Sequence, residues 1–380
     1  MFVCTFFAIE LALTYARWRE AARLWLLAWA MTAALLYVGH FVFFHHLLDL
    51  MPVMDSLYTT CNLAVYPLYL IYIYRMTERT QPRWLTWLLL LPVGMGLVAG
   101  GLYFAMDADE VRRFFGLYLY ENTLAGLSGV PLAMGIHHHV CRVLFAVEVV
   151  MTVVLGIRQI RRYNHLVETL YADTEDKTLE AIHRVLVLLV VTAAVSFVAN
   201  VLGRAVVDDF GWLKAMMAVL FSSLLFSIGW VGLWQRFSIT DVVRDIETHE
   251  AELLKDGGVV AFDFLGSETP LKQKLEWAMR EQQLYLQADL KLSDVARQLG
   301  TNRTYLQQML RDELHATFSE YVNRLRINHA RRLLQQEPEQ PLSNVAHRVG
   351  YASLSSFYRN WNRYSMERVE EGVTAPPDTR

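Results

Sequence analysis

The sequence contains few charged residues and few cysteines. Of its 380 residues, 19% are Asp, Glu, Lys or Arg and 54% are hydrophobic, whereas a typical soluble domain has about 25% charged residues. This shortage of polar surface excludes a disordered chain and disfavours an ordinary soluble enzyme. The three cysteines (Cys4, Cys61 and Cys141) lie in apolar segments and are too few for a disulfide framework or a zinc site. The composition therefore indicates a membrane protein.

The hydrophobic residues are concentrated in the first 235 positions. A helix needs about 20 apolar residues to cross the hydrocarbon core of a bilayer. Five charge-free segments reach or approach that length, and two further segments carry ionisable residues. Residues 114–135 are apolar but interrupted by glycine and proline, so we expect an interfacial or re-entrant loop there. The seven predicted spans are residues 1–16, 24–44, 57–74, 84–106, 137–157, 185–202 and 215–234.

Basic residues are unevenly distributed between the loops. The segments after the first, third and fifth predicted spans hold eleven Lys and Arg residues, and the loops on the opposite side hold four. Positively charged loops stay in the cytoplasm. We therefore expect a multi-pass protein of the inner membrane, with its N-terminus outside the cell and everything after Trp234 in the cytoplasm.

The composition changes after Arg236. Residues 241–289 hold eleven acidic and five basic side chains, whereas residues 291–363 hold eleven basic and six acidic ones. This charge asymmetry separates an acidic connector from a basic domain. The predicted parts are a seven-span sensor or anchor region (1–236), a helical connector (237–289), a DNA-binding domain (290–364) and a tail (365–380).

An internal repeat occupies the basic region. The run LSDVARQLG at 292–300 returns as LSNVAHRVG at 342–350. Its serine is expected to cap a short helix, and its glycine to end that helix in the left-handed conformation. A second helix follows each copy, so the repeats predict helix-turn-helix units at 292–311 and 342–361. The second helix of such a unit enters the major groove of DNA.

The segment between the two copies has a useful length. Thr317 to Gln336 shows an apolar helical face, and a helix of twenty residues is about 30 Å long. Successive major grooves on one side of DNA are about 34 Å apart. A rigid helix of this length would hold two reading helices one helical turn of DNA apart.

Two runs in this region carry a family resemblance: YVNRLRINHARRLL at 321–334 and VAHRVGYASLSSFYRNW at 345–361. The segment from Leu290 to Trp361 resembles the DNA-binding domain of AraC/XylS-type transcription regulators. The segment 364–371 lacks the Gly and Pro that usually close this domain. The whole chain further resembles, by architecture, members of the family that join a multi-span region to this domain. The resemblance implies an all-α fold, a polytopic helical bundle followed by two helix-turn-helix subdomains on a linker helix.

The resemblance also implies roles for individual residues. Gln pairs well with adenine and Arg with guanine, whereas contacts to phosphate position the protein without specifying sequence. The implied partners are double-stranded promoter DNA, RNA polymerase and a second copy of the chain. The implied base-reading residues are Thr304, Gln307, Gln308, Leu354, Ser355 and Arg359. The expected phosphate contacts are Arg303, Arg311, Arg324 and Arg363.

Histidines and ionisable residues in the apolar region suggest a sensing function. Histidine binds transition metals and changes its charge between about pH 5 and 8, but amphipathic imidazoles also accumulate at membrane interfaces. Ionisable residues at membrane depth are costly unless they are paired or line a cavity, so either a ligand pocket or a structural ion pair would explain them. The candidate sensing residues are His45, His46, His137, His138, His139, Arg142 and Glu148.

These patterns predict a membrane-bound, sequence-specific transcription regulator that couples a membrane or extracytoplasmic signal to gene expression. No nucleotide-binding loop, catalytic triad or phosphoacceptor segment is recognisable, so we predict neither an enzyme nor a cofactor. The alternative is a membrane transporter or membrane enzyme with a cytoplasmic helical protein-interaction domain. A further alternative is a membrane anchor that tethers DNA without sensing.

Overall fold

The computed structural model describes residues 2–202, 211–255 and 269–365. The predicted all-α class is confirmed: 79% of the chain is helical, and the described residues contain no strand. One isolated bridge joins Tyr171 to Lys291. The chain forms two compact units. The first unit comprises Met1–Arg161 and Leu179–Thr240, and the second comprises Arg162–Thr178 and Asp241–Arg380.

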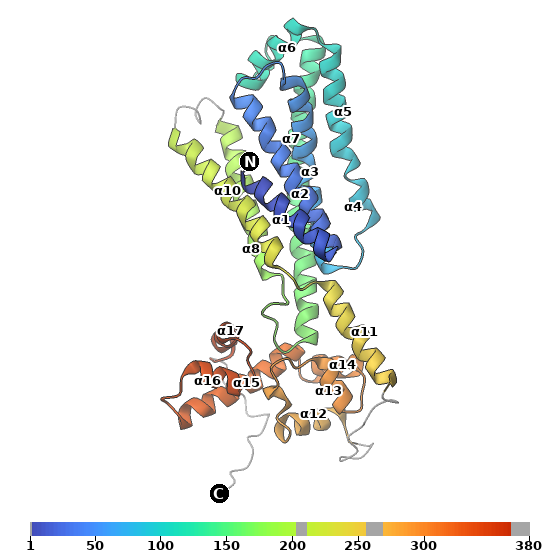
Figure 1. Cartoon of the computed structure of the whole chain (residues 1–380), viewed down its shortest axis with the longest axis vertical. Coiled ribbons are helices and arrows are strands. Elements are labelled where there is room, and N and C mark those ends of the chain that lie inside the picture. The colour runs from blue at the N-terminus through green and yellow to red at the C-terminus, as the bar shows by residue number, and fades with distance from the viewer. Residues whose placement is uncertain (1, 203–210, 256–268, 366–380) are drawn as a thin grey trace. The chain divides into compact units, whose positions relative to one another are not determined.

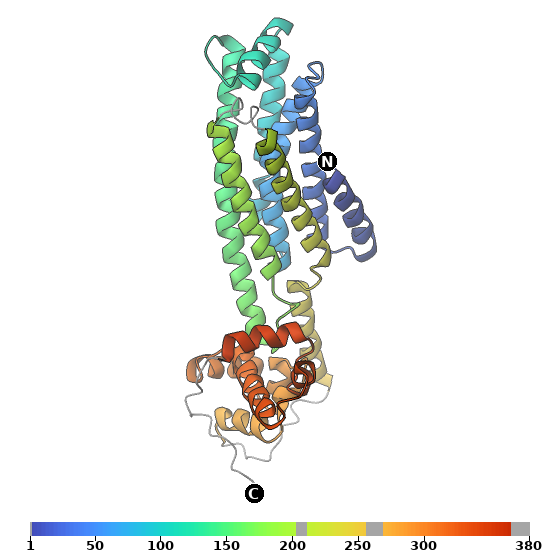
Figure 2. The same cartoon turned by 90° about the vertical axis from the view of Figure 1, so that its left-hand side faces the viewer.

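The first unit is a bundle of long helices. The helix α2 packs against α3, and α3 packs against α5. The helix α1 packs against both α2 and α10. The helices α8 and α10 lie side by side in both views (Figure 1, Figure 2). The bounds are α1 Phe2–Trp18, α2 Ala21–Phe44, α3 Met51–Thr77, α4 Arg83–Trp87, α5 Leu90–Ala105, α6 Ala108–Phe114, η1 Phe115–Tyr120, α7 Gly129–Leu170, α8 Glu180–Leu202 and α10 Gly211–Trp234.

Four described helical segments are long and apolar enough to cross a membrane. They coincide with four of the seven predicted spans, the second, fourth, fifth and seventh. Large apolar side chains are exposed along them, including Leu97, Phe104 and Val143, as expected for helices that face lipid rather than water. The four segments are Ala21–Phe43, Arg83–Ala105, Gly129–Leu170 and Ala215–Thr248.

The apolar segment 114–135 folds without a further long helix. After the π-helical turn η1, the chain turns twice at residues with positive φ, Asn122 and Gly126, and α7 begins at Gly129. Phe114 and Tyr118 are buried against α5 and the start of α7 in one apolar cluster. The segment therefore adds no separate membrane-length helix, and its interfacial or re-entrant position remains a prediction.

The second unit contains the repeat. The longest helix described in it, α15, corresponds to the predicted linker helix (Figure 1). Thr317 caps α15 by accepting from the Glu320 N–H (3.2 Å), and Glu320 accepts from the Thr317 N–H (3.0 Å). The bounds are α11 Ile239–Lys255, α12 Leu271–Arg280, η3 Leu284–Leu286, α13 Leu292–Gln298, α14 Arg303–Glu313, α15 Phe318–Gln336, α16 Leu342–Arg348 and α17 Leu354–Tyr364.

One local expectation about the repeat is wrong. Ser293 and Ser343 are not N-caps, because α13 and α16 begin at Leu292 and Leu342. In α13 the buried Leu292 is the first helical residue, and Lys291 is the N-cap. The Asp294 carboxylate accepts from the Lys291 N–H (3.2 Å). The glycine stops are as predicted, with φ of +68° at Gly300 and +92° at Gly350.

The second unit also contains residues 162–178, which comprise the C-terminal end of α7 and most of the connection from α7 to α8. The predicted tail lies outside the described residues except for Ser365, as do residues 256–268 of the connector. The proposed domain borders at 236, 289 and 364 remain predictions.

Candidate nucleic-acid interface

The first helix-turn-helix unit packs on a small apolar core. Val295 of α13, Leu306 of α14 and Val322 of α15 are fully buried. The Asn302 side chain caps α14 by accepting from the Tyr305 N–H (2.9 Å). Because one face of α14 is buried in this core, the opposite face is exposed to solvent.

That solvent face carries the residues expected to read DNA. Thr304 and Gln308 are exposed, and Gln307 is partly exposed. Tyr305 is 63% exposed and was missed by the sequence analysis, which had no reason to distinguish it from a core aromatic residue. An exposed ring beside two amide side chains adds a stacking or phosphate-contacting group to the same face.

The second unit repeats this arrangement with a larger core. Val345 of α16 and Phe357 of α17 pack with Ile327 and Ala330 of α15. The Ser353 hydroxyl caps α17 by accepting from the Ser356 N–H (3.0 Å). The predicted reading residues Leu354, Ser355 and Arg359 are exposed. Tyr358, also exposed at 43%, is a second aromatic residue that the sequence analysis did not select.

A buried arginine joins the linker helix to the segment before the first repeat. Arg326 of α15 is 0% exposed. It donates from Nε to the Tyr285 carbonyl (2.7 Å) and from Nη2 to the Gln287 carbonyl (2.6 Å), and its guanidinium lies 5.2 Å from the centre of the Tyr351 ring. Burial lowers the pKa of the guanidinium and raises that of the Tyr351 hydroxyl. Sequence periodicity offered no signal for this contact.

The arginines expected to bind phosphate are partly engaged within the protein. Arg311 forms an exposed ion pair with Asp312 (2.7 Å), and Arg363 pairs with Glu320 (3.0 Å). Arg324 lies over the Tyr364 ring at 5.7 Å, and Arg303 is partly exposed at the start of α14. Exposed pairs of this kind are worth at most about 1 kcal/mol, so phosphate oxygens can replace the carboxylates.

A further arginine of the linker helix binds main-chain carbonyl groups. Arg331 donates from Nη2 to the Tyr364 carbonyl (2.9 Å) and also to the Ser365 carbonyl. It thus satisfies carbonyl groups at the end of α17, where a cation is favoured by the helix dipole. Its neighbour Arg332 is exposed.

The N-terminal end of α17 also meets acidic side chains from residues 171–178. The Ser356 hydroxyl donates to Asp173 Oδ1 (2.8 Å), and the hydroxyls of Ser353 and Ser355 donate to the Glu175 carboxylate. Two of the residues predicted to read DNA therefore contact Glu175. Ser355 is hydrogen-bonded to its carboxylate, and Arg359 Nη2 lies 3.6 Å from Glu175 Oε1. These contacts lie within the second unit.

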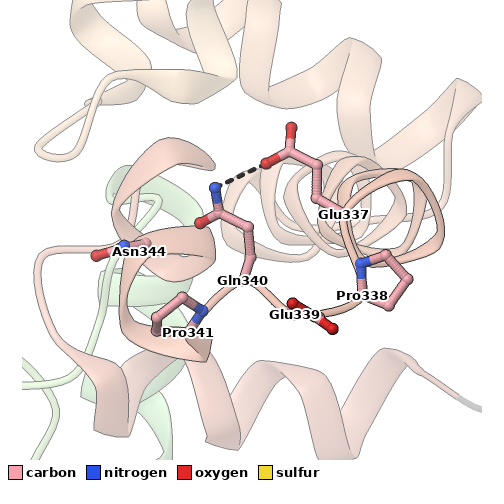
Figure 3. A pocket seen from close by; sticks show the side chains of 6 residues that line it. All are labelled: Glu337, Pro338, Glu339, Gln340, Pro341 and Asn344. Atoms are coloured by element: carbon pink, nitrogen blue, oxygen red, sulfur yellow. Dashed lines mark hydrogen bonds between the residues drawn. The ribbon is translucent and has the colours of Figure 1, made fainter.

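A shallow depression lies between α15 and α16. Within it, Gln340 Nε2 donates to Glu337 Oε2 (2.7 Å, Figure 3), and Arg348 holds the same carboxylate (2.9 Å) and lowers its pKa. The two glutamates at its rim would repel phosphate, so we expect no DNA contact there. It is lined by Glu337, Pro338, Glu339, Gln340, Pro341 and Asn344.

The three consecutive histidines His137, His138 and His139 each contact a different partner. His138 Nε2 lies 2.9 Å from Asp55 Oδ2, which also accepts from the Tyr103 hydroxyl (2.7 Å). His139 Nδ1 lies 3.1 Å from the Tyr118 hydroxyl, and His137 Nε2 lies 3.5 Å from the Cys141 sulfur. Among the described residues, no three His, Cys, Asp or Glu side chains are grouped so as to hold a metal ion.

The remaining candidate sensing residues are dispersed. The ring of His45 lies 4.3 Å from that of Phe41 with the two planes tilted, and the ring of His46 lies 4.7 Å from that of Tyr120. Arg142 and Glu148 do not pair with each other: Arg142 donates to Asn122 Oδ1 (3.1 Å), whereas the Glu148 carboxylate is buried and accepts no hydrogen bond from the described residues.

Comparison with known proteins bears on the second unit. Residues 295–369 match the family described as a helix-turn-helix domain, and the match is to an AraC-type domain. Neither the curated proteins nor the solved structures contain a match to the chain. The fold and the family match together indicate a DNA-binding transcription regulator with several apolar helices on its N-terminal side.

Proposed function

We propose that this protein is a membrane-bound regulator that binds specific promoter sequences and couples a membrane or extracytoplasmic signal to transcription. The single observation that carries the proposal is the pair of capped helices, α14 and α17, which expose polar faces from helix-turn-helix units on one linker helix. The chain also contains four helical segments able to cross a membrane.

The reading helices are proposed to enter successive major grooves. α15 has 19 residues and is therefore about 28 Å long, close to the separation of about 34 Å between grooves on one side of the duplex. Thr304, Gln307 and Gln308 would contact bases in one groove, and Leu354, Ser355 and Arg359 in the next. Arg303, Arg311, Arg324 and Arg363 would contact phosphates.

The membrane region is proposed to have seven spans, with the DNA-binding domain in the cytoplasm. α1, α3 and α8 would add to the four apolar segments, and the basic loops would remain inside. Its signal would bias one of two arrangements of the cytoplasmic domain, with a changed dimer and recruitment of RNA polymerase as the output. Replacing His137, His138 and His139 by alanine tests their part in sensing: an unchanged response to metal, chelator and pH would exclude it.

The main test is genome-wide crosslinking and immunoprecipitation in the native host. It compares the intact protein with the double variant Gln307→Ala, Arg359→Ala. A matched control, Arg332→Ala with Gln336→Ala, removes the same side-chain types from exposed positions of α15. We expect a few sharp binding sites for the intact protein and the control, and their loss in the reading-helix variant. A good bidentate base contact is worth about 1–3 kcal/mol, so losing two contacts should lower occupancy at least tenfold.

Two other results would redirect the proposal. If all three forms gave no discrete sites, the DNA-reading function would be refuted and a protein-binding role of the helical domain would take its place. If sites were found but did not respond to any change of envelope conditions, the protein would tether DNA without sensing.

A further inference from the structure

The connection between α7 and α8, residues 171–178, is fixed by its main chain to the helix-turn-helix region. The Ala172 N–H donates to the Leu290 carbonyl (3.1 Å). The Ala172 carbonyl accepts from Asn323 Nδ2 (2.8 Å) and from the Ser319 hydroxyl (3.1 Å). Ala172, Ser319 and Asn323 are all buried, so these bonds are shielded from competing water and hold the segment in one position.

This anchoring presents two carboxylates to the N-terminal end of α17. Asp173, only 9% exposed, accepts from the Ser356 hydroxyl (2.8 Å). The Glu175 side chain is 17% exposed, accepts from the Ser353 and Ser355 hydroxyls, and lies 3.6 Å from Arg359. Serine hydroxyls, an arginine and a helix N-terminus are the groups that DNA-binding proteins use to hold phosphate. The carboxylates therefore occupy the place of a DNA anion.

The same donors cannot serve both a carboxylate and DNA. Ser355 and Arg359 are two of the three residues proposed to read bases from α17, and the partly buried position of Glu175 leaves its ion pair little screened by salt. Negative charge at this site would also repel an approaching phosphate backbone. Asp176, one residue further along, is exposed and makes no hydrogen bond or ion pair within the described part of the chain. A negative charge in this loop is therefore not sufficient for contact with α17; the position of the side chain also matters.

We propose that residues 171–178 act as an intramolecular inhibitor that imitates DNA, and that the second reading helix binds its site only after Asp173 and Glu175 leave α17. The inference rests on the proposed DNA-binding function and adds its regulation. The segment joins α7, a candidate membrane-spanning helix, to α8 along the chain. A signal that shifts these helices would therefore change the availability of the reading helix without any separate messenger.

The test compares Glu175→Ala with Asp176→Ala in the full-length protein in lipid nanodiscs. Each change removes one negative charge from the same loop, but only the first removes the contact with Ser355 and Arg359. The DNA probe is a duplex from the strongest crosslinked site, with a scrambled duplex as reference, and binding is followed by fluorescence anisotropy. The apparent Kd is the intrinsic Kd divided by the open fraction, so a contact closed for 90–99% of the time masks about 10–100-fold of affinity.

We expect Glu175→Ala to tighten binding about tenfold or more beyond Asp176→Ala and the unchanged protein. Equal affinities for the two variants, with sequence preference intact, would overturn the inhibitor and leave the DNA-binding function standing. If no form preferred the site over the scrambled duplex, the proposed function would fail and the inhibitor with it.

A second measurement needs no substitution. Hydrogen–deuterium exchange of the unchanged protein should show faster exchange across residues 173–178 when the duplex is bound, because the Asp173 carboxylate, which accepts from the Glu175 N–H (3.1 Å), leaves its position beside α17. Unchanged or slower exchange there on DNA binding would overturn the proposal.

Discussion

Replacing Arg326 by methionine is expected to destabilise the second unit by about 2–4 kcal/mol. The methionine fills a similar volume but leaves the carbonyls of Tyr285 and Gln287 buried without their donor. Each unsatisfied acceptor costs about 1–3 kcal/mol. Part of this cost is offset because a desolvated cation is removed, together with Nη1, which has no hydrogen-bond partner in the described structure.

The assay is pulse proteolysis of the full-length protein across a urea series, read from cleavage within the second unit. At a typical slope of about 1–2 kcal/mol per molar urea, the expected loss lowers the midpoint by about 1–4 M. Arg332→Met is the matched control, since it makes the same change at an exposed position of the same helix, and it should move the midpoint by less than about 0.5 M. A midpoint for Arg326→Met equal to or above that of the unchanged protein would refute the reasoning. Desolvation of the guanidinium would then destabilise the folded state at least as much as its hydrogen bonds stabilise it.

Two further substitutions test the second unit in the same assay. Gly350→Ala should cost about 2 kcal/mol or more, because φ is +92° and an added Cβ would lie 2.6 Å from the Leu286 carbonyl oxygen; a loss below about 0.5 kcal/mol would show that the turn adapts. Burial, Arg332 and Arg348 lower the pKa of His329, so the folded state favours the neutral ring, and stability should fall as the pH drops below the unfolded value of about 6.5. His329→Gln should reduce the difference between urea midpoints at pH 7.5 and 5.5, and an unchanged difference would contradict this account.

The repeat was predictable because its signals are local. Apolar spacing, a polar cap and a glycine stop all act within about ten residues, and the structure has each of them in α14, α17 and the turns at Gly300 and Gly350. The misplaced N-cap shows the limit of such signals. Ser293 is a good capping residue, but the buried Leu292 begins the helix earlier because tertiary packing outweighs a capping preference of about 1 kcal/mol.

The contacts between distant residues were not predictable. Nothing in the pattern around Arg326 distinguishes it from its solvated neighbours, since burial of a charge depends on carbonyls that lie about forty residues earlier in the chain. The same holds for Arg331, whose carbonyl partners end a helix that starts more than twenty residues later. Periodicity identifies which face of a helix is apolar, but not which polar residue will find a partner inside.

The acidic segment was overlooked for a more specific reason. The positive-inside rule counts Lys and Arg, because acidic residues contribute little to orientation, so the loop after the fifth predicted span was read as basic. Asp173 and Glu175 of this loop do not help to predict membrane orientation, but their carboxylates contact the N-terminal end of α17. The Lys and Arg residues of this loop are proposed to keep it in the cytoplasm, and its Asp and Glu residues are proposed to contact α17. Because the two functions depend on different residues, each can be changed by mutation without changing the other.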